Sequence, residues 1–181
     1  MAETIFRDIG VYKNTIISYL LQSPDILEIL LGTGYTEEQV IGDDSGKGGV
    51  VYSNIFPYLF VQTTQDVAKS YLCIEVDPII DNKNMKKNII TIWAYSHKDI
   101  MQYDKEDFIG TRPDILTDMV DRQLRFMIKD LIEKAKTNSD TKLKIGMGEL
   151  LPKSPMHIFP ATNFYGRSIV YEAPDFTVKN T

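Results

Sequence analysis

Residues 112–136 read RPDILTDMVDRQLRFMIKDLIEKAK and carry the strongest helical pattern in the chain. Apolar residues recur in it every three or four positions, which is the spacing of one face of an α-helix. These residues are Ile115, Leu116, Met119, Val120, Leu124, Met127, Ile128, Leu131, Ile132 and Ala135. Pro113 and Asp114 suit the first turn, and the lysines at the far end complement the helix dipole. The stretch therefore predicts a long amphipathic helix.

Three runs before this helix are typical of β-strands, because they are rich in β-branched and aromatic residues. They read FPYLFVQT at 56–63, SYLCIEVD at 70–77 and NIITIWAYS at 88–96. The third run is apolar on both of its alternating faces, as expected of a central strand that is covered on both sides. After the helix, LKIGMGELL at 143–151 and NFYGRSIVYEA at 163–173 predict two more strands.

The N-terminal part of the chain predicts two helices. Apolar residues from Ile5 to Leu21 follow the helical period, and Ser23 before Pro24 marks the end of this helix and the cap of the next. The second helix ends at Gly32, and TEEQV after it is consistent with one further turn. The order of elements predicts an α+β fold with a mostly antiparallel sheet, N-terminal helices and the long helix packed on one face.

We expect a single domain over residues 1–181. Within it we assign N-terminal helices to 1–31, a flexible loop to 32–55, the α+β core to 56–172 and a tail to 173–181. Long polar or proline-rich connections occupy 32–55, 77–88, 97–112 and 152–163. Connections of that length in a compact domain are functional or disordered, so we expect contact surfaces for neighbouring subunits there.

The composition excludes several classes of function. The net charge of −5 provides no global basic field that attracts nucleic acid. Cys73 is the only cysteine, so the chain has no intrachain disulfide and no thiolate metal cluster, and we expect this side chain to be buried. The N-terminus does not read as a signal peptide, and no segment approaches the ~20 apolar residues that span a bilayer. We expect a cytosolic protein or a particle assembled in the cytosol.

The glycine-rich stretch GDDSGKGGVV at 42–51 invites comparison with a phosphate-binding loop. A Walker A loop has the pattern GxxxxGK followed by Ser or Thr, whereas Gly42 and Gly46 enclose only three residues and Gly48 follows Lys47. Two aspartates would repel a phosphate, and the stretch leads into a strand rather than a helix. We predict a mobile connection that becomes ordered against a neighbour in an assembly.

The chain offers two histidines for acid–base or metal chemistry, His97 and His157. His97 lies two residues before Asp99, but metal sites use three or four convergent ligands, and the chain has no HxxxH or HExxH spacing. The acidic run from Asp104 to Asp107 lacks the spacing of an EF-hand, and no serine has a nucleophile motif around it. We expect no catalytic, cofactor-binding or metal-ligating residue.

One local basic patch stands out in PIIDNKNMKKN at 78–88. It consists of Lys83, Lys86 and Lys87, which we place at the tip of a long hairpin. Such a patch either contacts an acidic partner or nucleic acid, or is simply solvated.

Taken in order, these elements resemble the tail-terminator and neck proteins of tailed bacteriophages, the head–tail joining proteins that cap the tail tube and join it to the head. The resemblance rests on ISYLLQSPDILEILLG, on the strand FPYLFV, on the hairpin that leads into the long helix, and on the strand pair LKIGMGELL and YGRSIVYEA. It covers most of residues 12–172, and the connections 32–55 and 97–112 have no counterpart in it.

The resemblance implies a structural virion protein in the tail or neck, assembled in the host cytoplasm and acting without a cofactor. It implies a homo-oligomeric ring, expected to be a hexamer, that is built by extending sheets or docking hairpins between subunits. Its axial partners would be tail-tube and connector proteins, and Lys83, Lys86 and Lys87 would face passing DNA or an adjoining ring. A head-completion or adaptor protein of the same neck is one alternative. A small metal-dependent nuclease using His97 and Asp99, or a monomeric binding module, are the others.

Overall fold

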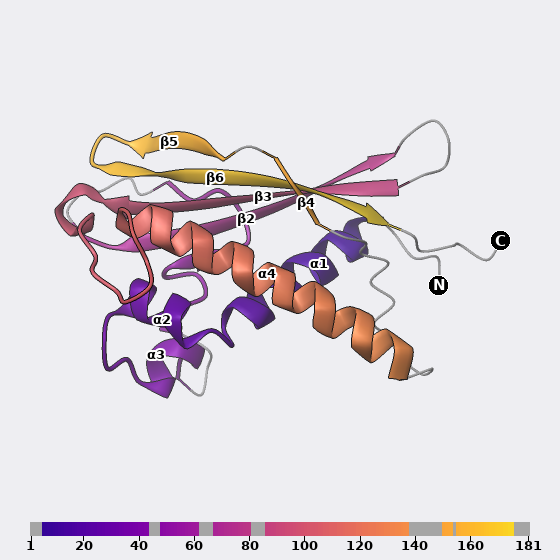
Figure 1. Cartoon of the computed structure of the whole chain (residues 1–181), viewed down its shortest axis with the longest axis horizontal. Helices are drawn as coiled ribbons and strands as arrows, with labels where there is room; N and C mark the ends of the chain where they lie inside the picture. Colours follow the sequence, from indigo (N-terminus) through magenta and orange to yellow (C-terminus); the bar gives the residue numbers. More distant parts are fainter. Residues whose placement is uncertain are drawn as a thin grey trace.

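The computed structural model describes residues 5–43, 48–61, 67–80, 86–137, 150–153 and 155–175. The helices are α1 (Ile5–Leu20), α2 (Pro24–Leu31), α3 (Glu37–Ile41), the short 3-10 helix η1 (Lys98–Ile100) and α4 (Arg112–Thr137). The strands are β1 (Ile55–Phe56), β2 (Ser70–Ile80), β3 (Lys86–His97), β4 (Leu151–Pro152), β5 (Met156–Ala161) and β6 (Phe164–Asp175). This arrangement confirms the predicted α+β class (Figure 1).

The strands form one open six-stranded sheet in the order β1-β2-β3-β6-β4, and β5 also pairs with β6. β3 pairs antiparallel with β2 on one side and with β6 on the other, whereas β1 runs parallel to β2. The run at 88–96 is therefore a central strand, as its two apolar faces predicted. Figure 1 shows α4 and α1 lying along the same side of this sheet.

Helices α1, α2 and α4 enclose the main hydrophobic core against one face of the sheet. From β3, the side chains of Ile90, Ile92 and Ala94 enter this core and are at most 2% exposed. Complete burial of an aliphatic side chain of this size contributes about 1.5–3 kcal/mol. The buried face predicted for α4 is confirmed between Ile115 and Ile128, but Ile132 is 46% exposed. Ile132 directly follows the half-buried Leu131, and the helix rotates by about 100° per residue, so it turns away from the sheet.

The opposite face of the sheet carries a smaller aromatic core. Its buried members are Phe56, Tyr71, Cys73, Tyr95 and Phe164. The segment Pro57–Val61 crosses this face, and the rings of Phe56 and Phe60 stack at 4.0 Å between centroids. The strand predicted at 56–63 is thus wrong beyond Phe56, because Pro57 cannot donate to a ladder and the aromatic residues are buried by covering the sheet. Residues 62 and 63 lie outside the described part.

Two predicted connections and the predicted C-terminal tail also require correction. Residues 77–88 were expected to form a loop, but Asp77 pairs with Ile89 and Ile80 pairs with Lys86, so the strands extend into this range. The connection predicted at 152–163 contains β5. The tail predicted at 173–181 begins inside β6, which runs to Asp175. Residues 138–149, which hold most of the strand predicted at 143–151, lie outside the described part.

The cap predicted at Ser23 is present, and the structure adds a second cap at Thr36, which was not predicted from the sequence. Ser23 caps α2 and Thr36 forms a capping box at α3, which satisfies backbone amides at both N-termini. Beyond α3, Val50 is fully buried, and the Asn54 amide donates to the carbonyls of Leu30 and Ser70 at 3.1 and 2.9 Å. Val50 and Asn54 are thus packed, whereas most residues from Gly32 to Ile41 are exposed and residues 44–47 lie outside the described part. The mobility of the connection stays a prediction.

Candidate interaction site

The structure does not hold the three predicted lysines together at a hairpin tip. Lys86 and Lys87 belong to β3, and Lys83 lies outside the described residues. The ammonium of Lys87 is 4.0 Å from the carboxylate of Glu172, which also binds Lys153 at 3.0 Å. Lys87 therefore belongs to a cluster of mixed charge, and its contact with DNA or with an adjoining ring stays a prediction.

His97 has a structural position at the end of β3. Its side chain is buried, its Nδ1 accepts the backbone N–H of Asp99 at 3.3 Å, and its ring packs edge-on against Phe164. Its Nε2 is buried without a hydrogen-bond partner. Within the described ranges, no group of three His, Cys, Asp or Glu side chains is placed to hold a metal ion. His97 and Asp99 thus touch each other, but no third ligand joins them there.

Cys73 is buried in the aromatic core, as its strand-like surroundings predicted. Burial raises the pKa of its thiol, because the thiolate loses its hydration there. A thiol in this setting is a small hydrophobic group rather than a nucleophile.

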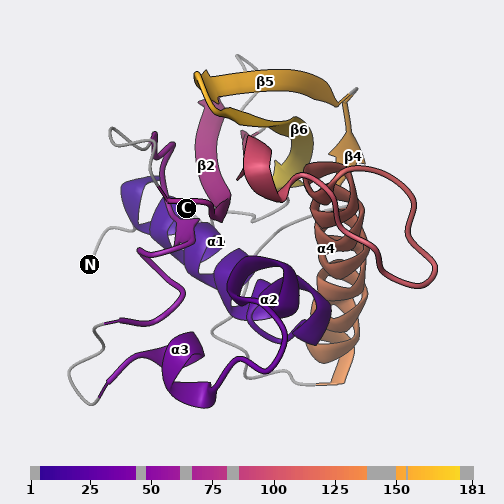
Figure 2. The same ribbon diagram turned by 90° about the vertical axis from the view of Figure 1, so that its left-hand side faces the viewer.

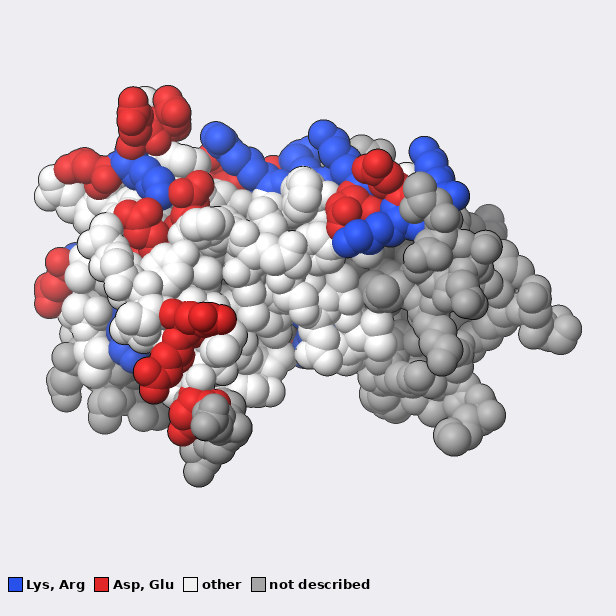
Figure 3. Space-filling model, turned by 90° about the horizontal axis from the view of Figure 1, so that it is seen from below, with Lys and Arg blue, Asp and Glu red and all other residues white. Residues whose placement is uncertain are grey.

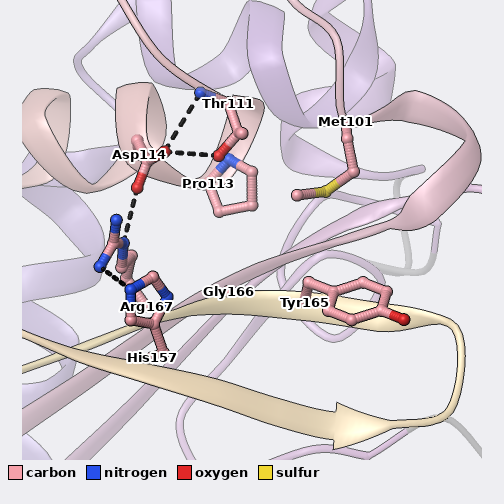
Figure 4. A pocket seen from close by; sticks show the side chains of 8 residues that line it. All are labelled: Met101, Thr111, Pro113, Asp114, His157, Tyr165, Gly166 and Arg167. Carbon is pink, nitrogen blue, oxygen red and sulfur yellow. Dashed lines mark hydrogen bonds and ion pairs between the residues drawn. The ribbon is translucent and has the colours of Figure 1, made fainter.

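The second histidine, His157, lies beside a hollow of about 140 Å³ at the N-terminal end of α4 (Figure 4). The hollow is lined by Met101, Thr111, Pro113, Asp114, His157, Tyr165, Gly166 and Arg167. The guanidinium of Arg167 donates to the Asp114 carboxylate at 2.6 Å and lies 2.8 Å from Nε2 of His157. Strands β5 and β6 and the first turn of α4 therefore meet through one chain of polar contacts.

Asp114 is the anchor of this chain of contacts. The backbone N–H and the hydroxyl of Thr111 donate to its second carboxylate oxygen at 3.2 and 2.6 Å. Burial pushes the pKa of Asp114 upward, but the hydrogen bonds from Thr111 and Arg167 outweigh it, and the pKa is lowered overall. Asp114 and Arg167 are therefore paired with each other, and their contact joins the first turn of α4 to β6.

The loop Met101–Thr111 begins and ends at this hollow and is held to the helices by charged side chains. The Lys105 ammonium lies 2.6 Å from the Asp25 carboxylate and 2.8 Å from that of Glu28, both on α2. Hydrogen bonds to these two carboxylates raise the pKa of Lys105. The Arg122 guanidinium of α4 lies 4.8 Å above the ring of Phe108. These contacts attach the loop to two helices at once.

The end of the loop is exposed and acidic. Ile109 is 100% exposed, and the exposed residues Asp104, Glu106 and Asp107 precede it. Figure 2 shows the loop projecting beyond α4. Functional residues are often carried on loops that a rigid scaffold positions, and an apolar side chain presented in this way is suited to contact another surface. The acidic run is evident in the sequence, whereas the tethers of the loop and the full exposure of Ile109 are not visible in the sequence pattern.

The two edges of the sheet, in contrast, carry features that discourage pairing with a strand of another chain. The edge along β6 is formed by β4 and β5, which contain Pro152 and Pro160 and shift register between Ile158 and Ala161. At the opposite edge, the backbone N–H of Leu72 in β2 points away from β3 and donates to the Asn54 carbonyl. Pro78 lies an even number of residues further along β2, so its nitrogen faces the same way and has no hydrogen to donate to an added strand. Prolines and bulges are the devices by which native sheets avoid pairing with another chain. Both edges therefore discourage the addition of a further strand.

A family model named YomW matches residues 23–173, from the cap of α2 to near the end of β6. The chain belongs to the YomW family. The family takes its name from YomW, a gene of a Bacillus phage region, which agrees with the phage origin that the resemblance implied. The YomW match includes both the loop Met101–Thr111 and the hollow at its base. No curated protein and no solved structure matches the chain.

In the described part of the chain, no helix has the length and apolar character needed to cross a bilayer.

Proposed function

We propose that this chain is a structural protein of the phage neck, a tail terminator that forms a ring, caps the tail tube and joins it to the head. The observation that carries the proposal is the loop Met101–Thr111, which is tied to two helices and exposes Ile109 completely. A protein that works by docking gains from fixed surfaces, because ordering a loose segment on binding costs free energy. The phage derivation of the family supports the same function.

In this proposal the chain acts through contacts and has no enzymatic activity, cofactor or metal. The buried position of His97, whose side chain caps η1, supports the proposal, because a metal-dependent nuclease needs accessible ligands that converge on one point. The paired state of Asp114 and Arg167 supports it as well, because both charges are used inside the fold.

The proposed partners are further copies of the chain, expected as a hexameric ring, together with the tail-tube and connector proteins above and below it. A closed ring requires two different surfaces on each subunit that fit each other head to tail. Contact with passing DNA would come from the β2–β3 hairpin, where Lys86 and Lys87 lie. The site of action is the virion, which is assembled in the host cytoplasm.

The test is genetic and uses a phage that carries this gene. Without the gene, we expect electron micrographs to show separate heads and tails, and tails of irregular length. Restoring the gene should restore joined particles, and antibody labelling should place the chain at the neck. Label that stays on isolated heads would instead indicate the head-completion or adaptor function. Normal infectious particles made without the gene, or purified particles that lack the chain, would overturn the proposal.

A further inference from the structure

Strand β5 lies at the edge of the sheet and contains no buried residue. It pairs antiparallel with β6 from Met156 to Ala161, and the register shifts between Ile158 and Ala161. The burial of apolar side chains therefore contributes little to its attachment, which depends on hydrogen bonds and on side-chain contacts with β6. One such contact joins the rings of Phe159 and Tyr165, whose centroids are 5.4 Å apart.

A second side-chain contact of β5 reaches across β6 to helix α4. His157 lies opposite Arg167 in the ladder, and its Nε2 is 2.8 Å from a terminal nitrogen of the Arg167 guanidinium. The Nε of the same guanidinium donates to the carboxylate of Asp114 at 2.6 Å. Figure 4 shows these three side chains in a row from β5 to the first turn of α4. The row His157, Arg167 and Asp114 is called the latch below.

The chemistry of the latch determines the protonation of its histidine. An arginine guanidinium offers only hydrogen-bond donors and does not lose its positive charge in a protein. The nitrogen of His157 that faces Arg167 must therefore accept a hydrogen bond, so the imidazole is neutral and carries its proton on Nδ1. A protonated imidazole has no acceptor, and it would place a second positive ring 2.8 Å from a guanidinium nitrogen.

Strand β6, the first turn of α4 and the loop Met101–Thr111 line the hollow together with His157. The titratable or charged side chains that these elements place there are Arg167, Tyr165 and Asp114. The acidic side chains at the end of the loop are not part of the lining, and Figure 3 shows acidic side chains gathered at the end of the molecule where this loop projects. The pKa of Asp114 is lowered, so this carboxylate stays ionised as the pH falls from neutral to 5. His157 is therefore the lining group whose charge changes between pH 5 and 8.

We infer that the latch is a pH-sensitive device, which holds β5 on the edge of β6 only while His157 is neutral. Near neutral pH, His157 accepts the hydrogen bond of Arg167 and thereby connects β5 to α4. As the pH falls and the imidazole gains a proton, the hydrogen bond is lost and the two cations repel each other. β5 then separates more readily and uncovers the edge of β6 between Phe164 and Ser168, where a strand of another chain can pair. This inference does not depend on the function proposed above.

The first test locates the proton on each of the two histidines of the wild-type chain. Nitrogen-15 NMR of the imidazole side chains distinguishes the two neutral tautomers. At pH 7.5 we expect His157 to carry its proton on Nδ1. His97 is the internal control, because its Nδ1 accepts the backbone N–H of Asp99 and its proton must lie on Nε2. The two rings should thus show opposite tautomers, and a proton on Nε2 of His157 would overturn the inference.

The second test measures how readily β5 opens. Amide hydrogen exchange is followed at pH 7.5 and pH 5.5 and expressed as protection factors, which remove the intrinsic effect of pH on the exchange rate. We expect the protection of the β5 amides, and of the β6 amides that pair with them, to be about two- to tenfold lower at pH 5.5, as for the loss of one hydrogen bond. The ladder between β2 and β3 does not involve β5 and should keep its protection at both pH values.

His157→Gln is the matched variant for the exchange measurement, and circular dichroism confirms that it is folded. Its amide oxygen can accept the hydrogen bond of Arg167 but does not titrate, so the protection of β5 should be the same at both pH values. An equal fall in the wild-type chain and in H157Q would assign the pH dependence to another group. Unchanged protection in the wild-type chain would mean that the latch does not hold β5. Either result overturns the inference.

Discussion

Two loops of this protein carry apolar side chains and use them in opposite ways. The segment Pro57–Val61 places the ring of Phe60 against that of Phe56, and the backbone carbonyl of Phe60 accepts a hydrogen bond from the Tyr95 hydroxyl. This segment therefore covers the aromatic core. The loop Met101–Thr111 is attached by Lys105 and leaves Ile109 fully exposed. The comparison shows that an apolar residue in a well-attached loop can be either buried against the sheet or left at the surface, and that its burial distinguishes the two.

The largest expected effect is the loss of the aromatic core. Phe56→Ala removes a ring that is 4% exposed and should lower the free energy of unfolding by about 3–5 kcal/mol, measured by denaturant titration. The matched control is Ile109→Ala, which should change it by less than about 0.5 kcal/mol, because Ile109 is fully exposed. Equal losses in the two variants would contradict the placement of Phe56 in the aromatic core and of Ile109 at the surface.

The next effect concerns the anchor of the exposed loop. Asp114→Asn weakens the contacts with Thr111 and Arg167 and should cost about 1.5–3 kcal/mol of stability near neutral pH. The folded-state pKa of Asp114 lies below its ordinary value of 3.8, so its contribution is present above that value and is lost as the pH falls through the lowered pKa. The loss of stability on acidification should therefore be shallower in the variant. Identical acid titrations of stability for both proteins would refute this role.

The third effect concerns the close approach of β6 to β3 at Gly166. A Cβ at this position would lie 2.2 Å from the Ala94 carbonyl oxygen, so only glycine allows β6 to approach β3 so closely. Gly166→Ala should lower the melting temperature and cost about 1–3 kcal/mol, since the backbone must shift. Gly10→Ala is a suitable control, because nothing lies within 4 Å of a Cβ there. A stable Gly166→Ala variant would show that β6 approaches β3 less closely.

The smallest global effect is expected at the tether of the exposed loop. Lys105→Met removes the contacts with Asp25 and Glu28 but should reduce global stability by only about 0.2–1 kcal/mol, because exposed ion pairs contribute little. Amide hydrogen exchange should nevertheless speed up within Met101–Thr111 and not within Pro57–Val61. Unchanged exchange in the first loop would mean that other contacts hold it in place.

Helix α4 and the cap of α2 were predictable because the forces that form them are local. The apolar period of residues 112–136 and the order Ser23, Pro24 each act over one or two helical turns. The central position of β3 was also predictable, because apolar residues on both of its faces require cover on both sides. These local patterns were sufficient for the α+β class.

Other features depended on partners that are distant in sequence. The run after Pro57 has strand-like composition, but its aromatic residues are buried by crossing a sheet face, which composition does not distinguish from pairing within the sheet. β5 lies in a proline-rich stretch that reads as a connection, and it forms because β6 offers it an edge. The contact between Asp114 and Arg167 spans 53 residues, so no spacing rule pointed to it.

The candidate interaction site divides in the same way. The acidic run, the exposed lysines of α4 and the single buried cysteine are evident from residue types and helical spacing alone. The tethering of Lys105 to Asp25 and Glu28, and therefore the fixed presentation of Ile109, arises only when the chain folds and brings α2 beside a loop about eighty positions later. Local chemistry sets which helices form and which face of each is apolar. Long-range packing sets which of the remaining side chains stay on the surface, because burial depends on neighbours that the chain meets only in three dimensions.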